Sequence, residues 1–278
     1  MKNKILNILI LNWNNKKALY DCISSIKRSN FNLYDITVID NGSSDGSIEY
    51  VKTKFDDINF IKIESNLGFA KGYNYAFKKL KNYKYKWYLI LNNDTILNRN
   101  TLSNIFSKIN IYGENNIFTG KILNINNNKI WYAGGGKNLF TGNMYHKGIN
   151  EEEINVSYKT DETEFVSGCF MLIKKEIIEK LNGFNQIYKM YYEDVDLCYR
   201  ANQIGVKCYF ISDSILLHHI SLSLGGRFSF LKTYNKIRSL IKFVYFNNKF
   251  HIFTIYCLVN ILLIPFYFIK IIFKNIFK

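Results

Sequence analysis

Four polar residues recur with nearly constant spacing in the first third of the sequence. They are Asn12, Asp40, Asn66 and Asp94, at separations of 28, 26 and 28 residues. A carboxylate such as Asp40 can accept a hydrogen bond from the imide N–H of a nucleotide base. A carboxylate such as Asp94 is a hard oxygen ligand for a divalent cation that bridges two phosphates. We therefore expect Asp40 to contact a ligand and Asp94 to hold a cation.

A second polar group lies far along the chain and places three carboxylates within four positions. They are Glu193, Asp194 and Asp196. Crowded carboxylates repel one another, which favours a site that binds cations or holds a proton acceptor. Asp196 has a simpler interpretation, because Arg200 follows four residues later and can pair with it on a helix. Glu193 and Asp194 are thus the candidates for chemistry.

The first polar group is positioned by a repeating pattern of strands and helices. Its members close four apolar runs that are typical of buried strands, at residues 5–11, 36–39, 60–63 and 87–91. Between them, residues 16–27, 47–55 and 68–80 have apolar side chains at helical spacing. This alternation predicts an open parallel sheet, in which ligands bind beyond the carboxyl ends of the strands. The four residues should therefore face one cleft.

Beyond residue 94 the pattern is less regular but still alternates. We predict helices near residues 100–109, 175–181 and 194–204. We predict strands near residues 117–123, 129–133 and 207–211, a further strand that ends at His218, and a second ordered block that begins with residues 165–173. One large α/β domain with an appendage fits the 278 residues, of which 48% are hydrophobic.

The charge of the chain is concentrated in its C-terminal part. The formal net charge is +15, and from Ser214 to Lys278 there are nine Lys and Arg residues and no acid. Residues 231–247 are amphipathic and basic, and the uncharged residues 252–269 follow. A membrane-spanning helix needs about 20 apolar residues, so we expect residues 225–278 to dock on an anionic membrane surface. A membrane span or a buried helix is the alternative for residues 252–269.

Several protein classes are disfavoured by missing motifs. No G-x-G-x-x-G follows the first strand and no G-x-x-x-x-G-K-[ST] loop occurs, which disfavours nicotinamide and P-loop enzymes. The five cysteines form no C-x-x-C pair and leave one unpaired, so neither a disulfide framework nor a zinc knuckle is supported. A reducing compartment is the simpler interpretation.

The order and spacing of eight short motifs resemble those of one enzyme family. The motifs are Asn12-Trp13-Asn14, Asp40-Asn41-Gly42-Ser43, residues 66–74, Leu91-Asn92-Asn93-Asp94, Ser167-Gly168-Cys169-Phe170-Met171, Gly183-Phe184, residues 192–197 and the region of His218. Over about residues 5–223 the chain is similar to inverting family 2 glycosyltransferases with a GT-A fold. The resemblance is to the rhamnosyltransferase-like branch of bacterial surface polysaccharide biosynthesis.

The resemblance implies a division of the chain and a fold. Residues 1–224 would form the GT-A domain, with a nucleotide-binding half at 1–98 and an acceptor and catalytic half at 99–224. Residues 225–278 would be the membrane-associating helical tail. The fold implied is α/β, an open and mostly parallel sheet flanked by helices, with a basic, apolar helical appendage.

The resemblance also assigns roles to individual residues. The nucleotide-sugar contacts implied are Asn12, Asn14, Asp40, Asn66, Asn93 and Asp94. Asp94 fills the last position of the family's D-x-D element, and Asn92 stands at the first. Asp94 and His218 would hold Mg²⁺ or Mn²⁺, with His219 as the competitor of His218.

On the acceptor side, Asp194 resembles the family's general base, and Glu193 precedes it. Tyr191, Tyr192 and the turn at residues 134–136 would shape the acceptor pocket. A base in this position deprotonates the acceptor hydroxyl on the face opposite the leaving group, so the anomeric centre inverts.

The activity implied is sugar transfer from dTDP-rhamnose or a UDP-hexose to a saccharide acceptor, expected to be lipid-linked. The location implied is the cytoplasmic face of the bacterial inner membrane, with peripheral or monotopic attachment. We expect no nucleic-acid partner, because the acids of the cleft repel phosphate unless a cation intervenes. Two alternatives stay open: a sugar nucleotidyltransferase, and a non-catalytic protein that binds a membrane or an anionic polymer.

Overall fold

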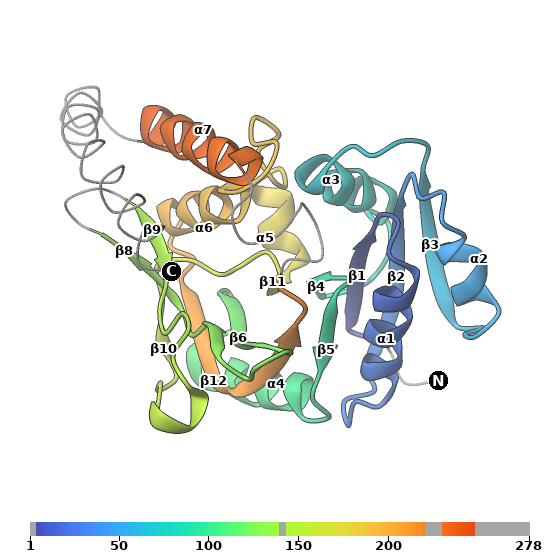
Figure 1. Cartoon of the computed structure of the whole chain (residues 1–278), viewed down its shortest axis with the longest axis horizontal. Coiled ribbons are helices and arrows are strands. Elements are labelled where there is room, and N and C mark those ends of the chain that lie inside the picture. Colours follow the sequence, from blue (N-terminus) through green and yellow to red (C-terminus); the bar gives the residue numbers. More distant parts are fainter. Residues whose placement is uncertain (1–3, 139–142, 221–229, 248–278) are drawn as a thin grey trace, which may run out of the picture.

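The computed structural model describes residues 4–138, 143–220 and 230–247. The first third of the chain alternates strands and helices as the sequence predicts (Figure 1). Its elements are β1 (Leu6–Asn12), α1 (Lys16–Lys27), β2 (Tyr34–Asn41), α2 (Ser47–Lys52), β3 (Ile58–Ile63), α3 (Phe69–Lys79) and β4 (Trp87–Asn92).

The rest of the described chain adds eight strands, one 3₁₀ turn and four helices. They are β5 (Thr95–Leu97), α4 (Thr101–Tyr112), β6 (Ile117–Asn124), β7 (Ile130–Tyr132), β8 (Gly135–Lys137), β9 (Met144–His146), the 3₁₀ turn η1 (Glu153–Asn155), β10 (Asp161–Glu162), β11 (Phe170–Lys174), α5 (Lys175–Lys180), α6 (Glu193–Gln203), β12 (Cys208–His218) and α7 (Phe230–Asn247). The predicted helices near 100–109, 175–181 and 194–204 are confirmed.

One sheet carries most of these strands, in the order β10-β12-β6-β11-β4-β1-β2-β3. β3, β2, β1 and β4 are mutually parallel, and β12 is parallel to β6. β11 lies antiparallel between β4 and β6. The sheet is therefore mostly parallel and runs through both predicted halves of the domain without a break.

Helices cover both faces of the sheet. Phe31, which follows α1, stacks on Phe106 of α4 with ring centroids 4.5 Å apart, so α1 and α4 share one face. Phe69 of α3 meets the edge of Phe184 at 5.3 Å, and α3, α5 and α6 lie together in the upper part of Figure 1. In the first turn of α3, Gly72 lies against Leu11 of β1, and a Cβ at residue 72 would lie 2.7 Å from the Leu11 side chain. The helix can pack this closely on the sheet because Gly72 has no side chain.

The last strand differs from the prediction. The sequence suggests two strands, at 207–211 and before His218, whereas β12 is one strand whose register against β6 shifts between Ile211 and Ile215. The shift brings the Ser214 carbonyl over Gly120, where a Cβ would meet that oxygen at 2.0 Å. The polar residues that suggested a break therefore form a bulge, which the missing side chain of Gly120 accommodates.

α7 packs on the domain through one face only. Phe243 and Val244 are buried, whereas Tyr234, Ile237 and Ile241 are 51%, 52% and 45% exposed. Within the described ranges, no helix is both long and apolar enough to cross a membrane. Residues 252–269, for which the sequence left a span open, lie outside these ranges.

Candidate active site

The carboxyl edge of the sheet gathers most of the predicted site. Asn12 is in register with Asp40, and Leu11 with Asn92, so β1, β2 and β4 end side by side. β12 ends there as well, with His218 in register with Asn124 of β6. Because β11 runs the opposite way, it begins at this edge and brings the segment before it into the site.

Asn12 is fully buried and its amide is fully engaged. Its Nδ2 donates to Ser43 Oγ at 3.1 Å and to Ser47 Oγ at 2.9 Å, and its Oδ1 accepts from Asn93 Nδ2 at 2.7 Å. Asn12 thus ties β1 to the loop after β2 and to the end of β4. With these bonds made, its contribution to a ligand site is to hold the two loops in place.

Asn14 and Asp40 shape the same loop. Asn14 Oδ1 accepts from the Ser44 N–H at 2.7 Å, and Asp40 Oδ1 accepts from the Ser43 N–H at 2.9 Å. Trp13, which precedes Asn14 in the chain, is 52% exposed. An exposed aromatic face at this edge can stack a nucleotide base. The sequence analysis did not single out Trp13, although its place at the end of the first strand was a usable signal.

Asn66 lies beside the outer strand β3. Its Oδ1 accepts from Asn41 Nδ2 at 2.9 Å and from the Gly68 N–H at 2.8 Å. The Leu67 N–H in turn donates to Asn41 Oδ1. The structure therefore joins Asn66 to the end of β2 and to the start of α3, while its role toward a nucleotide stays a prediction.

Asp94 and His218 form a buried pair, although they are 124 residues apart. Asp94 Oδ1 lies 3.1 Å from His218 Nε2. Two adjacent ligands of an octahedral ion with bonds of roughly 2.1 Å are about 3.0 Å apart, so the pair has the spacing of two cation ligands. His219 meets Asp94 only through its backbone, its N–H donating to the Asp94 carbonyl at 2.9 Å. His218 is therefore the histidine whose ring can share a cation with Asp94.

The remaining ligands of such a cation would have to come from elsewhere. Among the described residues, no group of three or more His, Cys, Asp and Glu side chains has a metal-binding arrangement. The pair thus fits a cation that completes its shell with water and with oxygens of a bound diphosphate, as hard divalent cations commonly do.

The protonation of His218 bears on cation binding. Burial lowers the pKa of His218, but the neighbouring Cys169 and the Asp94 carboxylate raise it to about 10. The ring of Trp131 packs against it with centroids 5.0 Å apart. A cation that binds His218 must displace a proton from it, so cation affinity should rise with pH.

Asp194 stands at the start of α6 with both carboxylate oxygens oriented. Its Oδ2 accepts from the Gly168 N–H at 2.9 Å, and its Oδ1 accepts from the Val195 N–H at 2.9 Å. Burial raises the pKa of Asp194, and these two hydrogen bonds oppose the rise. A carboxylate with a raised pKa is a stronger base than an ordinary aspartate, and its orientation is fixed.

Glu193 is the protonated neighbour of this base. Burial and the Asp194 carboxylate raise the pKa of Glu193 to about 8. Its Oε2 is buried and has no hydrogen-bond partner within the described part of the chain. Burial and the closeness of the two carboxyl groups therefore disfavour a pair that carries two negative charges.

The two tyrosines before α6 adopt an uncommon backbone conformation. Tyr191 and Tyr192 have φ angles of 66° and 70°. Side-chain-bearing residues adopt this left-handed region at a cost of roughly 1–3 kcal/mol each, and such strain concentrates at functional sites. The strain turns the chain into α6, so that Glu193 and Asp194 form its first turn.

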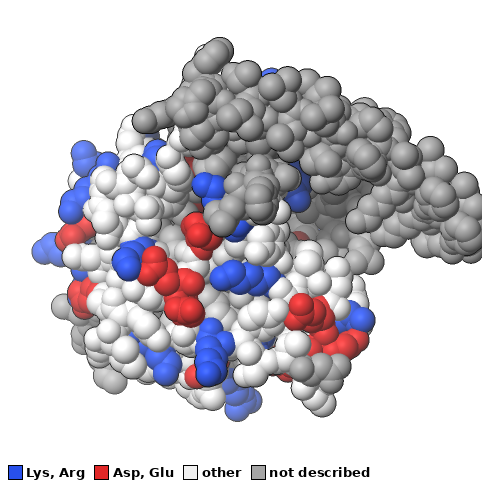
Figure 2. Space-filling view, turned by 90° about the vertical axis from the view of Figure 1, so that its left-hand side faces the viewer, with Lys and Arg blue, Asp and Glu red and all other residues white. Residues whose placement is uncertain are grey.

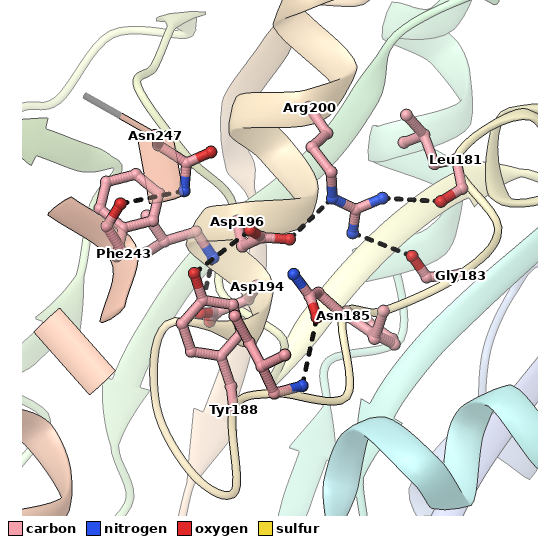
Figure 3. A network of polar contacts seen from close by, with 12 residues as sticks. Leu181, Gly183, Asn185, Tyr188, Asp194, Asp196, Arg200, Phe243 and Asn247 are labelled. Atoms are coloured by element: carbon pink, nitrogen blue, oxygen red, sulfur yellow. Dashed lines mark hydrogen bonds and ion pairs between the residues drawn. The ribbon is translucent and has the colours of Figure 1, made fainter. Parts of the chain in front are cut away.

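Asp196 serves the structure, as its pairing with Arg200 predicts (Figure 3). Arg200 Nε donates to Asp196 Oδ2 at 2.7 Å, and the other guanidinium nitrogens donate to the carbonyls of Leu181 and Gly183. The Tyr188 hydroxyl donates to Asp196 Oδ1 at 3.3 Å. The guanidinium thus fastens α6 to the loop after α5. The sequence predicted the pairing of Arg200 with Asp196 but not its hydrogen bonds to the loop after α5.

Residues 168–169 connect the polar residues around Asp94 with those around Asp194. The Asn92 N–H donates to the Cys169 carbonyl at 3.1 Å, and the next residue back, Gly168, holds Asp194. The charges of His218, Asp94 and Asp194 all act on the Cys169 thiol. The cation pair and the candidate base therefore both lie close to residues 168–169.

Comparison with known protein families shows to which family the chain belongs. The model of a family described as glycosyl transferase family 2 matches residues 7–182, which is more than half of the chain. The chain belongs to glycosyl transferase family 2. The matched region includes the three strand ends and the segment that holds Asp194, whereas α6, β12 and α7 lie beyond it.

A curated relative of this glycosyltransferase is rhamnosyltransferase WbbL of Escherichia coli (strain K12). The two are 34% identical over 74 residues, which are 26% of this chain and 28% of WbbL. The chain thus matches little more than a quarter of the length of that relative.

Solved structures confirm the fold of the glycosyltransferase. A crystal structure of GalNAc-T7 with UDP, GalNAc and Mn²⁺ superposes with a TM-score of 0.69 at 15% identity, over 88% of this chain and 48% of the other. S. aureus TarS superposes with a TM-score of 0.60 at 14% identity, over 86% and 39% of the two chains. The predicted GT-A fold is confirmed.

Proposed function

We propose that this glycosyltransferase moves a sugar from a nucleoside diphosphate donor to a saccharide acceptor, with inversion at the anomeric carbon. The donor proposed is dTDP-rhamnose or a UDP-hexose. The observation that carries the proposal is that the Asp94–His218 pair and the oriented Asp194 carboxylate both lie close to residues 168–169. A leaving diphosphate needs a group that holds a cation, and an attacking hydroxyl needs a base, and one site here offers both.

The nucleoside would bind at the ends of β1 and β2. Asp40 is nine-tenths buried and one of its oxygens is held by the Ser43 N–H, so its other oxygen can accept from a base imide. Trp13, which follows Asn12 at the end of β1, is an exposed aromatic residue at the same edge of the sheet. Asn12, Asn14 and Asn93 then act by fixing the loops on which these groups stand.

Asp194 is proposed as the general base. As the acceptor oxygen attacks the anomeric carbon, its proton passes to the Asp194 carboxylate, and the bond to the diphosphate breaks on the opposite face. The hydrogen bonds from the Gly168 and Val195 N–H groups orient the carboxylate throughout. Glu193, protonated at neutral pH, keeps the negative charge of the pair on Asp194.

Asp94 and His218 are proposed to hold Mg²⁺ or Mn²⁺. When bound, such a cation neutralises the charge that develops on the leaving diphosphate. Support comes from the 3.1 Å spacing of the two side chains and from the Mn²⁺ in the GalNAc-T7 structure.

We further propose a lipid-linked acceptor and attachment to the cytoplasmic face of the bacterial inner membrane. The outward face of α7 is apolar at Ile237 and Ile241, and the chain is free of acids from Ser214 onward. The inward face of α7 places Phe243 against Tyr192, with ring centroids 5.5 Å apart. A membrane bound by α7 would therefore lie near the acceptor side of the site.

A donor screen tests the transferase proposal. Purified protein is incubated with UDP-, dTDP- and GDP-sugars, with and without Mn²⁺ or Mg²⁺, and nucleoside diphosphate release is measured. We expect cation-dependent release from one donor. If no donor is hydrolysed and no nucleotide binds in the presence of cation, the proposed function is wrong.

A further inference from the structure

A cavity of about 510 Å³ lies on the side of the molecule away from the nucleotide end. It is enclosed by the hairpin of β8 and β9, by β10, and by α6 and α7 (Figure 1). Its volume is within the range of roughly 300–1,000 Å³ that is typical of small-molecule sites. The Asp94–His218 pair does not line it, so the cavity is separate from the cation site.

The charged groups around the cavity are of both signs. Lys137 and Lys147 line it and have no acidic partner among the described residues. Glu162 and Glu164 line it as well, and Glu162 pairs with Lys207 at 2.8 Å. Figure 2 faces this side of the molecule, on which basic and acidic side chains are interspersed. A strongly anionic ligand is disfavoured by the glutamates, and a lipid chain by all four charges.

The uncharged lining is suited to a hydroxyl-rich ligand. Asn202 both donates and accepts hydrogen bonds, as a sugar hydroxyl does. Tyr199 and Phe243 add aromatic surface, with ring centroids 5.6 Å apart. Together with the ammonium and carboxylate groups, this lining supplies donors, acceptors and ring faces, which is the combination that an uncharged saccharide requires.

The cavity is joined to the acceptor side of the active site in two ways. Asp194, Cys198 and Asn202 follow one another at four-residue spacing on one face of α6. The cavity touches Cys198 and Asn202, roughly 6 and 12 Å along the helix from Asp194. In addition, Phe243 lines the cavity and packs against Tyr192 with ring centroids 5.5 Å apart.

We propose that this cavity binds the part of the acceptor that extends away from the reacting hydroxyl, an uncharged oligosaccharide segment several sugars long. This inference rests on the proposed function, because it takes the acceptor to be a saccharide whose hydroxyl meets Asp194. The site selects acceptors by length. A single sugar at Asp194 does not reach Asn202, whereas a longer chain does.

The test compares two substitutions on neighbouring exposed residues of α6. Asn202→Trp fills the cavity, and Gln203→Trp is the matched control, because Gln203 does not line it. The probes are a monosaccharide and a tetrasaccharide fraction obtained by mild acid hydrolysis of the surface polysaccharide of the producing cells. Binding is measured by saturation-transfer NMR without donor, and transfer is measured with the active nucleotide sugar.

We expect wild type and Gln203→Trp to bind the tetrasaccharide, and Asn202→Trp to bind it at least about tenfold more weakly. In transfer, Asn202→Trp should raise KM for the tetrasaccharide without changing kcat, the monosaccharide rate or donor hydrolysis. Lys147→Met, which keeps most of the side-chain stem, should weaken tetrasaccharide binding about tenfold. Lys159→Met, at an exposed lysine that does not line the cavity, should have no effect.

The inference and the proposed function fail in different ways. If wild type binds no tetrasaccharide, or if Asn202→Trp binds it as tightly as wild type, the cavity is not an acceptor site, whatever the donor screen shows. If the tetrasaccharide binds and Asn202→Trp abolishes this binding while no donor is hydrolysed, the saccharide site stands and the transferase proposal falls.

Discussion

Replacing Asp194 by Asn separates base catalysis from the structural role of the same side chain. The carboxylate accepts one hydrogen bond on each oxygen, from Gly168 and from Val195. An asparagine amide can accept only one of them, and its NH₂ group faces the other N–H. The loss of one hydrogen bond to a charged group costs about 1.5–3 kcal/mol, which for a chain of this size lowers the melting temperature by roughly 3–12 °C.

The catalytic loss should be much larger than this structural cost suggests. General-base catalysis contributes typically about 10²- to 10⁴-fold, so kcat for transfer should fall by that factor. Donor affinity should be unchanged, because the Asp194 carboxylate is hydrogen-bonded to the Gly168 and Val195 N–H groups and not to Asp94 or His218. Transfer is measured by nucleoside diphosphate release in the presence of acceptor, and donor binding by isothermal titration calorimetry.

Asp196→Asn is the matched control on the same helical turn. It removes a partly buried ion pair to Arg200, so it should cost about 3–5 kcal/mol of stability and leave kcat within about threefold. Asp194→Asn should therefore have the larger loss of kcat, and Asp196→Asn the larger drop in melting temperature. A kcat of Asp194→Asn within about threefold of wild type would remove Asp194 from the mechanism.

Four further changes test other parts of the site. Asn74→Ala removes the two buried hydrogen bonds that join α3 to the backbone of Phe184, and should lower the free energy of unfolding by about 2–4 kcal/mol in urea titrations. The pKa of Glu193 is raised in the fold from 4.5 to about 8, so the folded state holds an extra proton between these values and stability should fall as pH rises through them; Glu193→Gln should flatten this dependence in melting curves at pH 4 to 9. Asp94→Asn should raise the Mn²⁺ concentration for half-maximal donor hydrolysis at least about tenfold, and an unchanged Mn²⁺ titration would exclude Asp94 as a ligand. Ile241→Asp on the exposed face of α7 should reduce sedimentation with phosphatidylglycerol vesicles without changing the melting temperature, and equal sedimentation would rule out this face as the membrane contact.

The alternation of strands and helices is predictable from the sequence because it is a local property. A buried parallel strand needs a short continuous apolar run, and a helix that covers a sheet needs apolar residues at a period of 3.6. The run at β1 and the helical pattern at α1 meet these conditions, and both elements fall within one residue of their predicted bounds. The bulge in β12 was missed because its polar residues are typical of a turn. Only the structure shows that Gly120 on the neighbouring strand leaves room for the bulge.

Part of the site is predictable for a related reason. Polar residues at the ends of parallel strands must share one edge of the sheet, so the placement of Asp40 and Asp94 follows from the strand pattern. The pairing of Asp196 with Arg200 follows from helix periodicity and is confirmed. Trp13 was missed because an aromatic residue next to a buried strand is ordinarily part of the core, and only the structure shows that it is exposed.

By itself, then, the sequence determined the order of the elements, the edge at which the strands end, and the residue types available there. The tertiary structure decided which of these residues meet. It inserted β11 antiparallel between β4 and β6, which placed Gly168 and Asp194 beside the end of β4. It also chose His218 over His219 as the partner of Asp94, across 124 residues. Local periodicity cannot specify such contacts, because they depend on which distant strands pair, and that pairing is settled only when the whole apolar core packs.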